Sequence, residues 1–468
     1  MLHRRKLGAF RVGGTEADRP RQESTTPEVT KAMRELGRDD ASLRPVFSTS
    51  RALCVLYDSP DVIARPSHQE PLPRKGLSMN PNTMRRTILR GGLALAGLGM
   101  AGVPEWVLPL LAEGEMLVPF TDIPENVRWE TPPDRRTLDV RTSSGPFTPA
   151  DKFFTTQHYG HPTVDASSFK LKISGLVNTA KSLSLDDLKR IGSTELVAGF
   201  ECSGNRGPLS GLSGNGKWTG VPLRAVLKTA GLQADAHDIV FFGADHGEEE
   251  VEWRTEKYKL DYHFGRSLPR EKALSAEPFV AWALNGAPLT THQGAPLRLL
   301  VPGWYGVSNV KWLSEIHAQA ERYLGKFQTR WYRTVRTEMV DGTMTVSETE
   351  VTHMLLKSFV ARVTSSGDAH TVLAVVLNDG TPIKSVEVRV DDGPWQMATP
   401  DATMKDKYGW KFYTYAWKGA TPGDHTVVSR VTDVTGLVQP TADELASKRS
   451  FLETNSQVPR KLKVAARG

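Results

Sequence analysis

One cysteine stands in a sequence that could present a thiolate to a bound group. Cys202 is one of two cysteines in the 468-residue chain, and it lies within the segment ECSGNRG (201–207). The serine and glycines beside it let the backbone approach a ligand closely, while Asn205 and Arg206 supply donors and positive charge that would favour the thiolate. The alternative is a buried, inert cysteine that packs as a small hydrophobic residue, because an isolated cysteine is weak evidence of chemistry.

The cysteine count limits what chemistry the thiol can serve. Cys54 lies far from Cys202 in unrelated sequence, and the chain has no C-x-x-C pair and no paired Cys/His spacing. These features exclude a disulfide framework and a four-ligand zinc site. The sequence also lacks a C-x-x-C-H haem-attachment motif, so any c-type haem would belong to a partner protein. One soft thiolate suits a metal that is held mainly by an external cofactor.

The positive charge of the chain is confined to its N-terminal quarter. The formal net charge is +6, and residues 1–78 carry 14 Lys and Arg against 10 Asp and Glu. Residues 79–112 carry 3 against 1, which leaves 42 against 42 for residues 113–468. The main body therefore has no basic excess, and no nucleic-acid partner is expected.

The N-terminal region divides into an extension and a signal-like segment. Residues 1–78 are rich in Arg, Pro, Ser and Thr without a regular hydrophobic period, which predicts a disordered or wrongly assigned extension. Residues 79–112 contain TMRRTILR (83–90) followed by the apolar run GGLALAGLGMAGV (91–103), a pattern typical of a twin-arginine export signal. The alternative for the apolar run is a buried helix. The twin-arginine interpretation predicts a periplasmic protein exported in its folded state, as proteins that carry a cofactor inserted beforehand commonly are.

Residues 113–340 have the alternating pattern of a mixed α+β domain. Strands are expected over 169–175, 195–200, 237–245 and 296–303, and helices over 184–190 and within 218–231. The strand over 195–200 leads directly into the cysteine segment, so it would position Cys202.

Residues 341–460 have a different sequence pattern, in which short runs of alternating apolar and polar residues are separated by turn-forming residues. Asn-Asp-Gly and Asp-Asp-Gly follow alternating runs within 373–398, and further alternating runs occupy 409–417 and 423–436. Several short strands at regular spacing predict a β-sandwich.

Four motifs together resemble the sulfite oxidase family of molybdopterin-dependent oxidoreductases. They are ECSGNRG (201–207), WTGVPLRAVL (218–227), PLRLLVPGWYGVSNVKWL (296–313) and VTDVTGLVQP (431–440). The resemblance covers about residues 115–440, in the family's order. It implies a molybdopterin-binding domain over 113–340 followed by an immunoglobulin-like dimerisation domain over 341–460, and hence a homodimer.

The resemblance also implies roles for individual residues. Cys202 matches the ligand to molybdenum, and Tyr332 matches a tyrosine that faces the substrate. The catalytic set is completed by Arg206 and Asp245. The positions that match cofactor contacts are Gln157, His158, Cys202, Asp245, Gln293, Arg298, Asn309 and Lys311.

Each of these residues also has a structural interpretation. A lone histidine is often a satisfied structural residue, and an aspartate after a strand is often a turn residue. Tyr332 could equally anchor a core, and Arg298 and Lys311 could be surface charges. In the functional interpretation the two cations bind the same phosphate, because a planar guanidinium and an ammonium can together hold such an anion.

Three positions depart from the family pattern. Thr156 and Gly207 stand where sulfite-oxidising members present arginines to the anion. The histidine often found before the PLR motif is replaced by Gln293, and His292 is displaced by one position. A doubly charged anion loses attraction when two cations are missing. The residues that could compensate are Arg206, His161, Arg330 and Arg333.

The predicted activity is oxygen-atom transfer between molybdenum and a small sulfur compound, with sulfite oxidation first among the candidates. Electrons would pass to a separate carrier such as a c-type cytochrome. The neutral residue at position 156 suits an alternative reaction on the same cofactor, the reduction of a sulfoxide or another oxide. From a different class, the chain could be a cofactor-free periplasmic binding protein.

Overall fold

The computed structural model describes residues 114–466, apart from 125–126, 128–129, 132–134, 144 and 207–208. The predicted extension and the signal-like segment lie outside the described residues, as do Gly207 and Cys54. In the part of the chain that the structure describes, no helix is long and apolar enough to cross a membrane.

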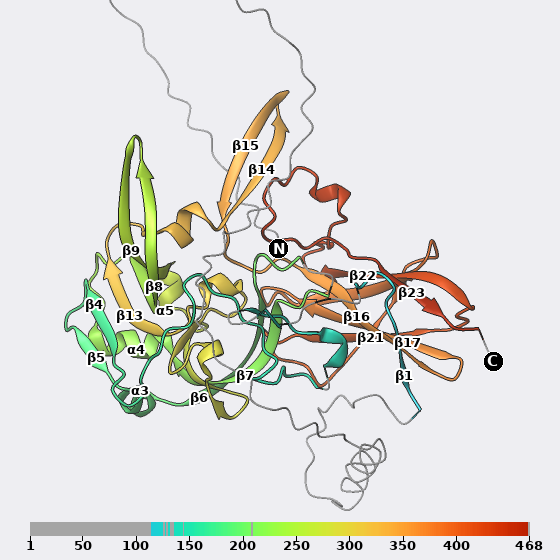
Figure 1. Cartoon of the computed structure of the whole chain (residues 1–468), viewed down its shortest axis with the longest axis horizontal. Helices are drawn as coiled ribbons and strands as arrows, with labels where there is room; N and C mark the ends of the chain where they lie inside the picture. Colours follow the sequence, from blue (N-terminus) through green and yellow to red (C-terminus); the bar gives the residue numbers. More distant parts are fainter. Residues whose placement is uncertain are drawn as a thin grey trace, which may run out of the picture. The chain divides into compact units, whose positions relative to one another are not determined.

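Two five-stranded sheets form the first half of the described chain (Figure 1). The first has the order β5-β4-β13-β8-β9, and only the β4–β13 pair is parallel. Its strands are β4 (Leu171–Gly175), β5 (Lys181–Leu183), β8 (Asp238–Trp253), β9 (Glu256–Pro269) and β13 (Leu313–Gln319). The second has the order β11-β10-β7-β6, and β12 also pairs with β10. Its strands are β6 (Thr194–Glu201), β7 (Ser213–Pro222), β10 (Phe279–Leu284), β11 (Ala287–Pro288) and β12 (Arg298–Leu300).

Three short α-helices pack against these sheets. They are α3 (Leu185–Ile191), α4 (Leu223–Ala230) and α5 (Arg270–Leu274). Helix α3 begins at Ser184, whose side chain caps the helix in a reciprocal capping box with Asp187. Helix α4 follows Pro222 and ends at Gly231, whose φ of +68° suits glycine. Both predicted helices are confirmed, but the described residues hold much more strand than helix, so the fold is richer in sheet than the α+β prediction.

A sandwich of two sheets forms the second half. The first sheet has the order β1-β16-β17-β21-β20 and the second the order β19-β18-β22-β23. The first sheet contains β1 (Met116–Val118), β16 (Lys357–Ser366), β17 (Ala369–Leu377), β20 (Thr399–Pro400) and β21 (Lys411–Trp417). The second contains β18 (Ile383–Val390), β19 (Gln396–Met397), β22 (Gly423–Asp433) and β23 (Arg460–Val464).

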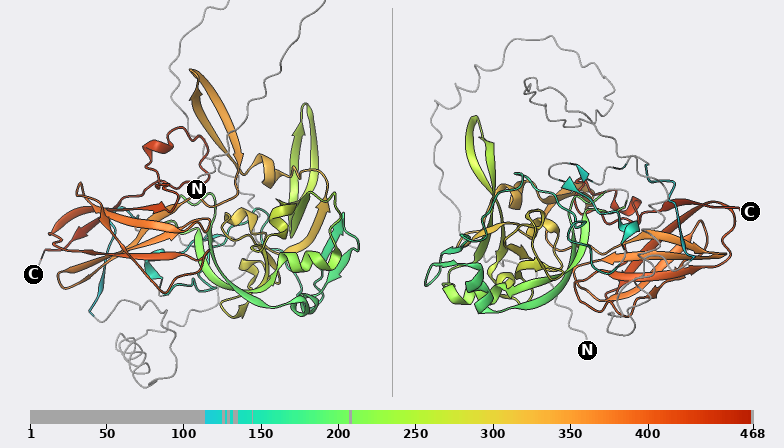
Figure 2. Two further views of the ribbon diagram at one scale, coloured as in Figure 1. Left: turned by 180° about the vertical axis from the view of Figure 1, so that it is seen from behind. Right: turned by 60° about the horizontal axis from the view of Figure 1, so that its bottom comes forward.

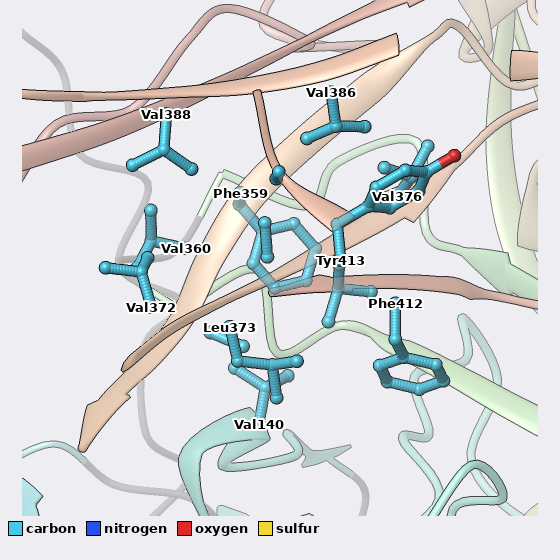
Figure 3. Close-up of a cluster of buried hydrophobic side chains, with 14 of the residues drawn as sticks. Val140, Phe359, Val360, Val372, Leu373, Val376, Val386, Val388, Phe412 and Tyr413 are labelled. Carbon is cyan, nitrogen blue, oxygen red and sulfur yellow. The ribbon is translucent and has the colours of Figure 1, made fainter. Parts of the chain in front are cut away.

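The two sheets of the sandwich share one hydrophobic core. Figure 3 shows Val386 and Val388 from one sheet gathered with Phe359 and Val372 from the other. Each of these four side chains is no more than 1% exposed. Alternation along β18 places Val386 and Val388 on the inner face, whereas β16 and β17 are buried over most of their length.

Two hairpins extend beyond the sheets. Strands β8 and β9 form one, and β14 (Arg333–Val340) with β15 (Thr343–Glu350) forms the other. Both project on the same side in Figure 1 and in the view from behind in Figure 2. The predicted domain boundary between residues 340 and 341 falls at the tip of the second hairpin, and the boundary itself stays a prediction.

The remaining short elements occupy connections. They are the pair β2 (Glu130–Thr131) and β3 (Arg135–Arg136), the 3₁₀ turns η1 (Val140–Thr142), η2 (Thr291–Gln293), η3 (Gly306–Ser308) and η5 (Asp443–Leu445), and the π-helical turn η4 (Lys326–Arg330). Two of them, η3 and η4, lie beside the candidate site. π-Helical turns such as η4 often occur at functional sites.

Candidate active site

A cavity of about 660 Å³, continuous with solvent, brings together residues from distant parts of the first half of the described chain. Eight of the ten predicted site residues line it: Gln157, His158, Cys202, Asp245, Arg298, Asn309, Lys311 and Tyr332.

Strand ends and the loops beside them position most of these side chains. Cys202 directly follows β6, and Arg298 is the first residue of β12. Lys311 precedes β13, and Tyr332 lies between the π-helical turn η4 and β14. Rigid sheets thus hold a site that is built largely on loops, the usual arrangement for binding and catalysis.

A buried ion pair fixes the strand that leads to the cysteine. The Glu201 carboxylate accepts hydrogen bonds from Lys357 Nζ at 2.8 Å and from Asn205 Nδ2 at 2.8 Å. The Glu201 and Lys357 side chains are 1% and 3% exposed. Asn205 closes the loop further by donating to the Ser210 carbonyl and accepting from the Leu212 amide. Lys357 begins β16, so the cysteine loop is tied to the sandwich.

The surroundings of Cys202 correct one inference from its sequence. Desolvation by the surrounding protein raises the pKa of the thiol, against a smaller lowering by the Gly204 backbone amide. The Asn205 side chain is already hydrogen-bonded to Glu201 within the loop. Arg206 is exposed, and its guanidinium lies 4.7 Å from the ring centre of Phe451. These two neighbours therefore do not activate the thiol. A bound metal would have to stabilise the thiolate itself.

Arg298 is a buried cation without an acidic partner. It is 4% exposed, and desolvation lowers its pKa to about 9. Its two terminal nitrogens donate to the carbonyl oxygens of Gln293 and Asn309, each at 3.1 Å, while Nε has no hydrogen-bond partner. A buried, unpaired positive charge that lines a cavity suits an anionic ligand.

Asp245 lies at an irregularity in the first sheet. The register of β8 against β9 shifts between Phe242 and His246, and Asp245 falls within this bulge and lines the cavity. Burial raises the pKa of Asp245 to about 6, even though the nearby Lys311 cation lowers it. Its Oδ1 atom is buried without a partner. A carboxyl group that titrates near neutral pH can either accept or donate a hydrogen bond to a ligand.

Lys311 and Gln157 meet at one wall of the cavity. Lys311 Nζ donates to Thr155 Oγ1 at 3.1 Å and to Gln157 Oε1 at 3.4 Å. The same ammonium lies 4.3 Å from the ring centre of Trp312. Asn309 also lines the cavity, and its side-chain oxygen accepts from the Val301 amide while its nitrogen donates to the Tyr305 carbonyl. Asn309 therefore shapes the turn between β12 and β13.

His158 and Tyr332 form a second pair on the lining of the cavity. His158 Nε2 lies 2.8 Å from the Tyr332 hydroxyl, and the imidazole stacks on Phe327 with 4.4 Å between ring centres. Desolvation and the Lys326 charge lower the pKa of His158 to about 4, so the ring is neutral at physiological pH. Burial raises the pKa of Tyr332, which keeps its hydroxyl protonated. A neutral imidazole and a phenol can share a proton without creating charge.

Two predicted residues lie outside the cavity lining. Arg206 contacts Phe451, as described above. Gln293 is 1% exposed and its amide bonds to the backbone of Ala150 and Thr290, so its carbonyl, not its side chain, reaches Arg298.

The proposed compensating cations are also placed elsewhere. Arg330 donates to the Tyr262 hydroxyl, Arg333 pairs with Glu348, and His161 contacts His292. None of these residues lines the cavity. Thr156 does line it, at the position where the family resemblance implies an arginine. Among the described lining residues, Arg298 and Lys311 are thus the cations, and His158 is the remaining basic side chain.

Sequence reasoning did not select the remaining walls of the cavity. These are Phe154, Thr155, Phe200, Phe264, Gly306, Val307 and Trp312. Most lie within a few residues of a selected residue in the sequence. For example, Trp312 follows Lys311, and Phe200 lies two residues before Cys202. Proximity in sequence was therefore the available signal, except for Phe264, which arrives from β9.

The donor set fits a molybdopterin group. Three lining residues keep buried polar atoms without hydrogen-bond partners: Arg298 Nε, Asp245 Oδ1 and Trp312 Nε1. Such atoms are costly unless a ligand satisfies them. A cation, a carboxyl group and an indole donor match a phosphate and the polar edge of a pterin, and Cys202 adds a soft ligand for a metal.

Comparison with known proteins gives a consistent result. Residues 158–327 match the oxidoreductase molybdopterin binding domain family. Human mitochondrial sulfite oxidase is 27% identical over 323 residues, which are 63% of this chain and 57% of the human protein. An NADH nitrate reductase from Ulva prolifera is 30% identical over 207 residues, 40% of this chain and 22% of that protein. The chain thus spans little more than half of the human relative.

A solved structure shows the same fold. The crystal structure of the sulfane dehydrogenase SoxCD from Paracoccus pantotrophus aligns with a TM-score of 0.60 and 22% identity. The alignment covers 79% of this chain and 97% of that chain.

Proposed function

Because this chain carries the molybdopterin-binding oxidoreductase domain of the sulfite oxidase family, we propose that it binds molybdenum–molybdopterin and transfers an oxygen atom to a small sulfur compound. Sulfite is the leading substrate. Oxidation of sulfite to sulfate takes one oxygen atom from water and releases two protons and two electrons.

The observation that carries the proposal is the presence of Cys202 and the unpaired Arg298 in one cavity. The cysteine supplies a soft ligand, and the buried guanidinium supplies positive charge for an anion. When bound, the cofactor provides the redox centre for oxygen transfer. Cys202 anchors it, Arg298 and Lys311 hold its charged end, and Asp245 hydrogen-bonds its polar edge.

The chain's own residues would also manage the substrate and its protons. Phe154, Phe200 and Phe264 exclude water from part of the cavity, which strengthens the polar interactions inside it. The Tyr332 hydroxyl would hold a hydrogen bond to a substrate oxygen, and neutral His158 would accept a proton passed through that hydroxyl.

One observation favours a second reaction. Thr156 is neutral where the family presents an arginine, and Arg298 and Lys311 are the Arg and Lys residues among the described lining residues. An uncharged oxide such as a sulfoxide needs no counter-charge. Reduction of such a substrate on the same cofactor is therefore the second candidate.

A pair of assays on one preparation tests both reactions. The full chain is purified from a host that makes the cofactor, and its molybdenum content is measured. Sulfite-dependent reduction of cytochrome c supports the leading proposal, whereas activity only in dye-driven sulfoxide reduction supports the second. A folded protein without molybdenum would overturn both and favour a cofactor-free binding protein.

We also propose the setting in which the enzyme acts. The twin-arginine pattern supports export to the periplasm, and a separate carrier such as a c-type cytochrome would take the electrons. The two-sheet sandwich supports an immunoglobulin-like dimerisation domain and a homodimer. Light scattering of the purified chain tests the dimer, and fusion of residues 79–112 to a reporter tests the signal.

A further inference from the structure

Three side chains at the base of the β8–β9 hairpin have the chemistry of metal ligands. His246, Asp261 and His263 each offer one nitrogen or oxygen atom, and these atoms all lie within 4.8 Å of one another. All three residues are exposed, and none lines the cavity. The cluster is therefore separate from the molybdopterin site, although His246 follows Asp245 directly.

The hairpin register explains why these residues meet. His246 lies opposite His263 in the antiparallel pair, and their rings stack with 4.8 Å between centres and 18° between planes. Asp261 precedes His263 by two residues, so both side chains point to the same face of β9. His246 Nδ1 lies 2.7 Å from Asp261 Oδ1.

A backbone carbonyl orients one of the two imidazoles. His263 Nδ1 lies 3.4 Å from the carbonyl oxygen of Gly243. Histidines that bind metals usually donate the other ring N–H to a carbonyl or carboxylate, which fixes the tautomer and raises the basicity of the ligand nitrogen. This contact leaves Nε2 of His263 as the atom that can bind a cation. The cluster therefore includes an outer partner as well as candidate ligands.

The charge of the hairpin also favours a cation. Residues 245–263 contain seven acidic residues against three Lys and Arg. Two of those cations are already paired, Lys257 with Glu250 and Lys259 with Glu248. The remaining negative charge concentrates divalent cations near the cluster.

We propose that His246, Asp261 and His263 bind a divalent metal ion of the zinc class. Two imidazole nitrogens and one carboxylate oxygen are ligands that zinc accepts, with water in the fourth position. Ligand atoms in such a site lie about 3.3 Å apart, which exposed side chains can reach by small rotations. The ion would join β8 to β9 beside the bulge that carries Asp245, and so would stiffen that wall of the cavity.

Zinc titration of the molybdenum-loaded full chain tests the site. Isothermal calorimetry is expected to show one equivalent of zinc bound, and His246→Ala or His263→Ala to weaken this binding at least about tenfold, because even the loss of an outer partner costs ten- to a hundredfold. Copper(II) bound in place of zinc should show two nitrogen ligands by electron paramagnetic resonance.

A matched control comes from the sandwich. His425 Nδ1 lies 2.8 Å from Asp391 Oδ2, a His–Asp pair that is not part of a cluster of three such ligands among the described residues. His425→Ala should leave zinc binding unchanged. Zinc binding that survives both cluster variants, or no zinc binding in the full chain, overturns the proposal. Neither result depends on turnover, so the outcome is separate from that of the proposed function.

Discussion

The Nε2 atom of His158 lies 2.8 Å from the hydroxyl oxygen of Tyr332, a residue 174 positions further along the chain. The π-helical turn η4 (Lys326–Arg330) positions both side chains, because Tyr332 follows the turn and Phe327 within it stacks on the His158 ring. The turn also holds Lys326, whose charge helps to lower the pKa of His158 after the larger effect of desolvation. One short irregular turn therefore fixes both the position and the protonation state of this pair.

The stability of the protein should depend on pH through His158. Its pKa is about 4 in the folded chain, against an ordinary value of 6.5. Between these values the unfolded chain binds more protons, so acidification lowers the free energy of unfolding through this window. His158→Gln removes this contribution, and the loss of thermal stability between pH 7 and pH 5 should become smaller.

His425 provides a control of opposite sign. Burial alone would lower its pKa, but its hydrogen bonds to Asp391 and to the Thr421 carbonyl raise the pKa above 6.5. Its contribution to stability is therefore full below pH 6.5 and lost as the pH rises through the raised value. His425→Gln should cost more stability at pH 5 than at pH 8. An identical acid response in wild type and His158→Gln would contradict the assignment.

Cys202→Ser should abolish turnover while leaving the fold intact. A hydroxyl is a harder and far less acidic ligand than a thiol, so it replaces the thiolate poorly on a soft metal. The measurements are steady-state activity, molybdenum content and circular dichroism of the purified variant. Full activity in the serine variant would show that Cys202 is not the ligand.

Arg298→Lys should reduce retention of the cofactor. The planar guanidinium of Arg298 donates to the Gln293 and Asn309 carbonyls and still has an N–H for a ligand. A lysine keeps the positive charge but cannot reproduce this geometry. Loss of one charge-assisted hydrogen bond corresponds to about 1.5–3 kcal/mol, or roughly a tenfold to hundredfold weaker affinity. Molybdenum content after gel filtration measures this. Arg430→Lys on β22, which pairs with Glu387, is the matched control and should retain the cofactor fully.

Thr156→Arg should improve the use of sulfite. The substitution places a guanidinium on the lining of the cavity, where Thr156 is exposed and an arginine can be accommodated. A new charge-assisted contact of about 1.5 kcal/mol would lower KM for sulfite roughly tenfold. Thr179→Arg, which lies outside the lining, controls for the change in net charge. An unchanged KM would argue that the anion does not approach this wall.

The buried Glu201–Lys357 pair should be important for stability. Lys357→Met leaves the Glu201 carboxylate buried without its cation, at a cost of about 3–5 kcal/mol. The double variant with Glu201→Gln should recover much of this loss. Lys172→Met removes the cation from the exposed pair with Glu315 and should cost at most about 1 kcal/mol. Urea denaturation of the three variants makes the comparison, and equal losses for Lys357→Met and Lys172→Met would refute it.

Local patterns predicted much of the fold because they depend on neighbouring residues. The cap at Ser184 and the glycine after α4 were visible in sequence; α4 ends before Gly231 as predicted, and α3 ends one residue later than predicted. Alternating runs likewise predicted the strands of the sandwich. The long β8–β9 hairpin was not predicted, because β8 continues through charged residues that show no alternation of apolar and polar side chains.

The candidate site divides in the same way. Residue types and their order, read with the family resemblance, selected Cys202 and Arg298, and the structure places both on one cavity. Sequence proximity was misleading for Asn205 and Arg206, which lie three and four residues after Cys202 but contact Glu201 and Phe451 instead. Adjacent residues on an irregular loop point in different directions, and only the packed structure decides which of them reaches the ligand.

The sequence by itself therefore determined the ligand types, the secondary-structure pattern and the family resemblance. The tertiary structure alone decided the electrostatics of the site: the raised pKa of Cys202, the unpaired charge of Arg298 and the neutral His158–Tyr332 pair. The physical reason is the distance along the chain over which each effect acts. Propensities and motifs act over a few residues, whereas desolvation and charge pairing depend on groups that folding brings together, such as Glu201 and Lys357 across 156 positions of the chain.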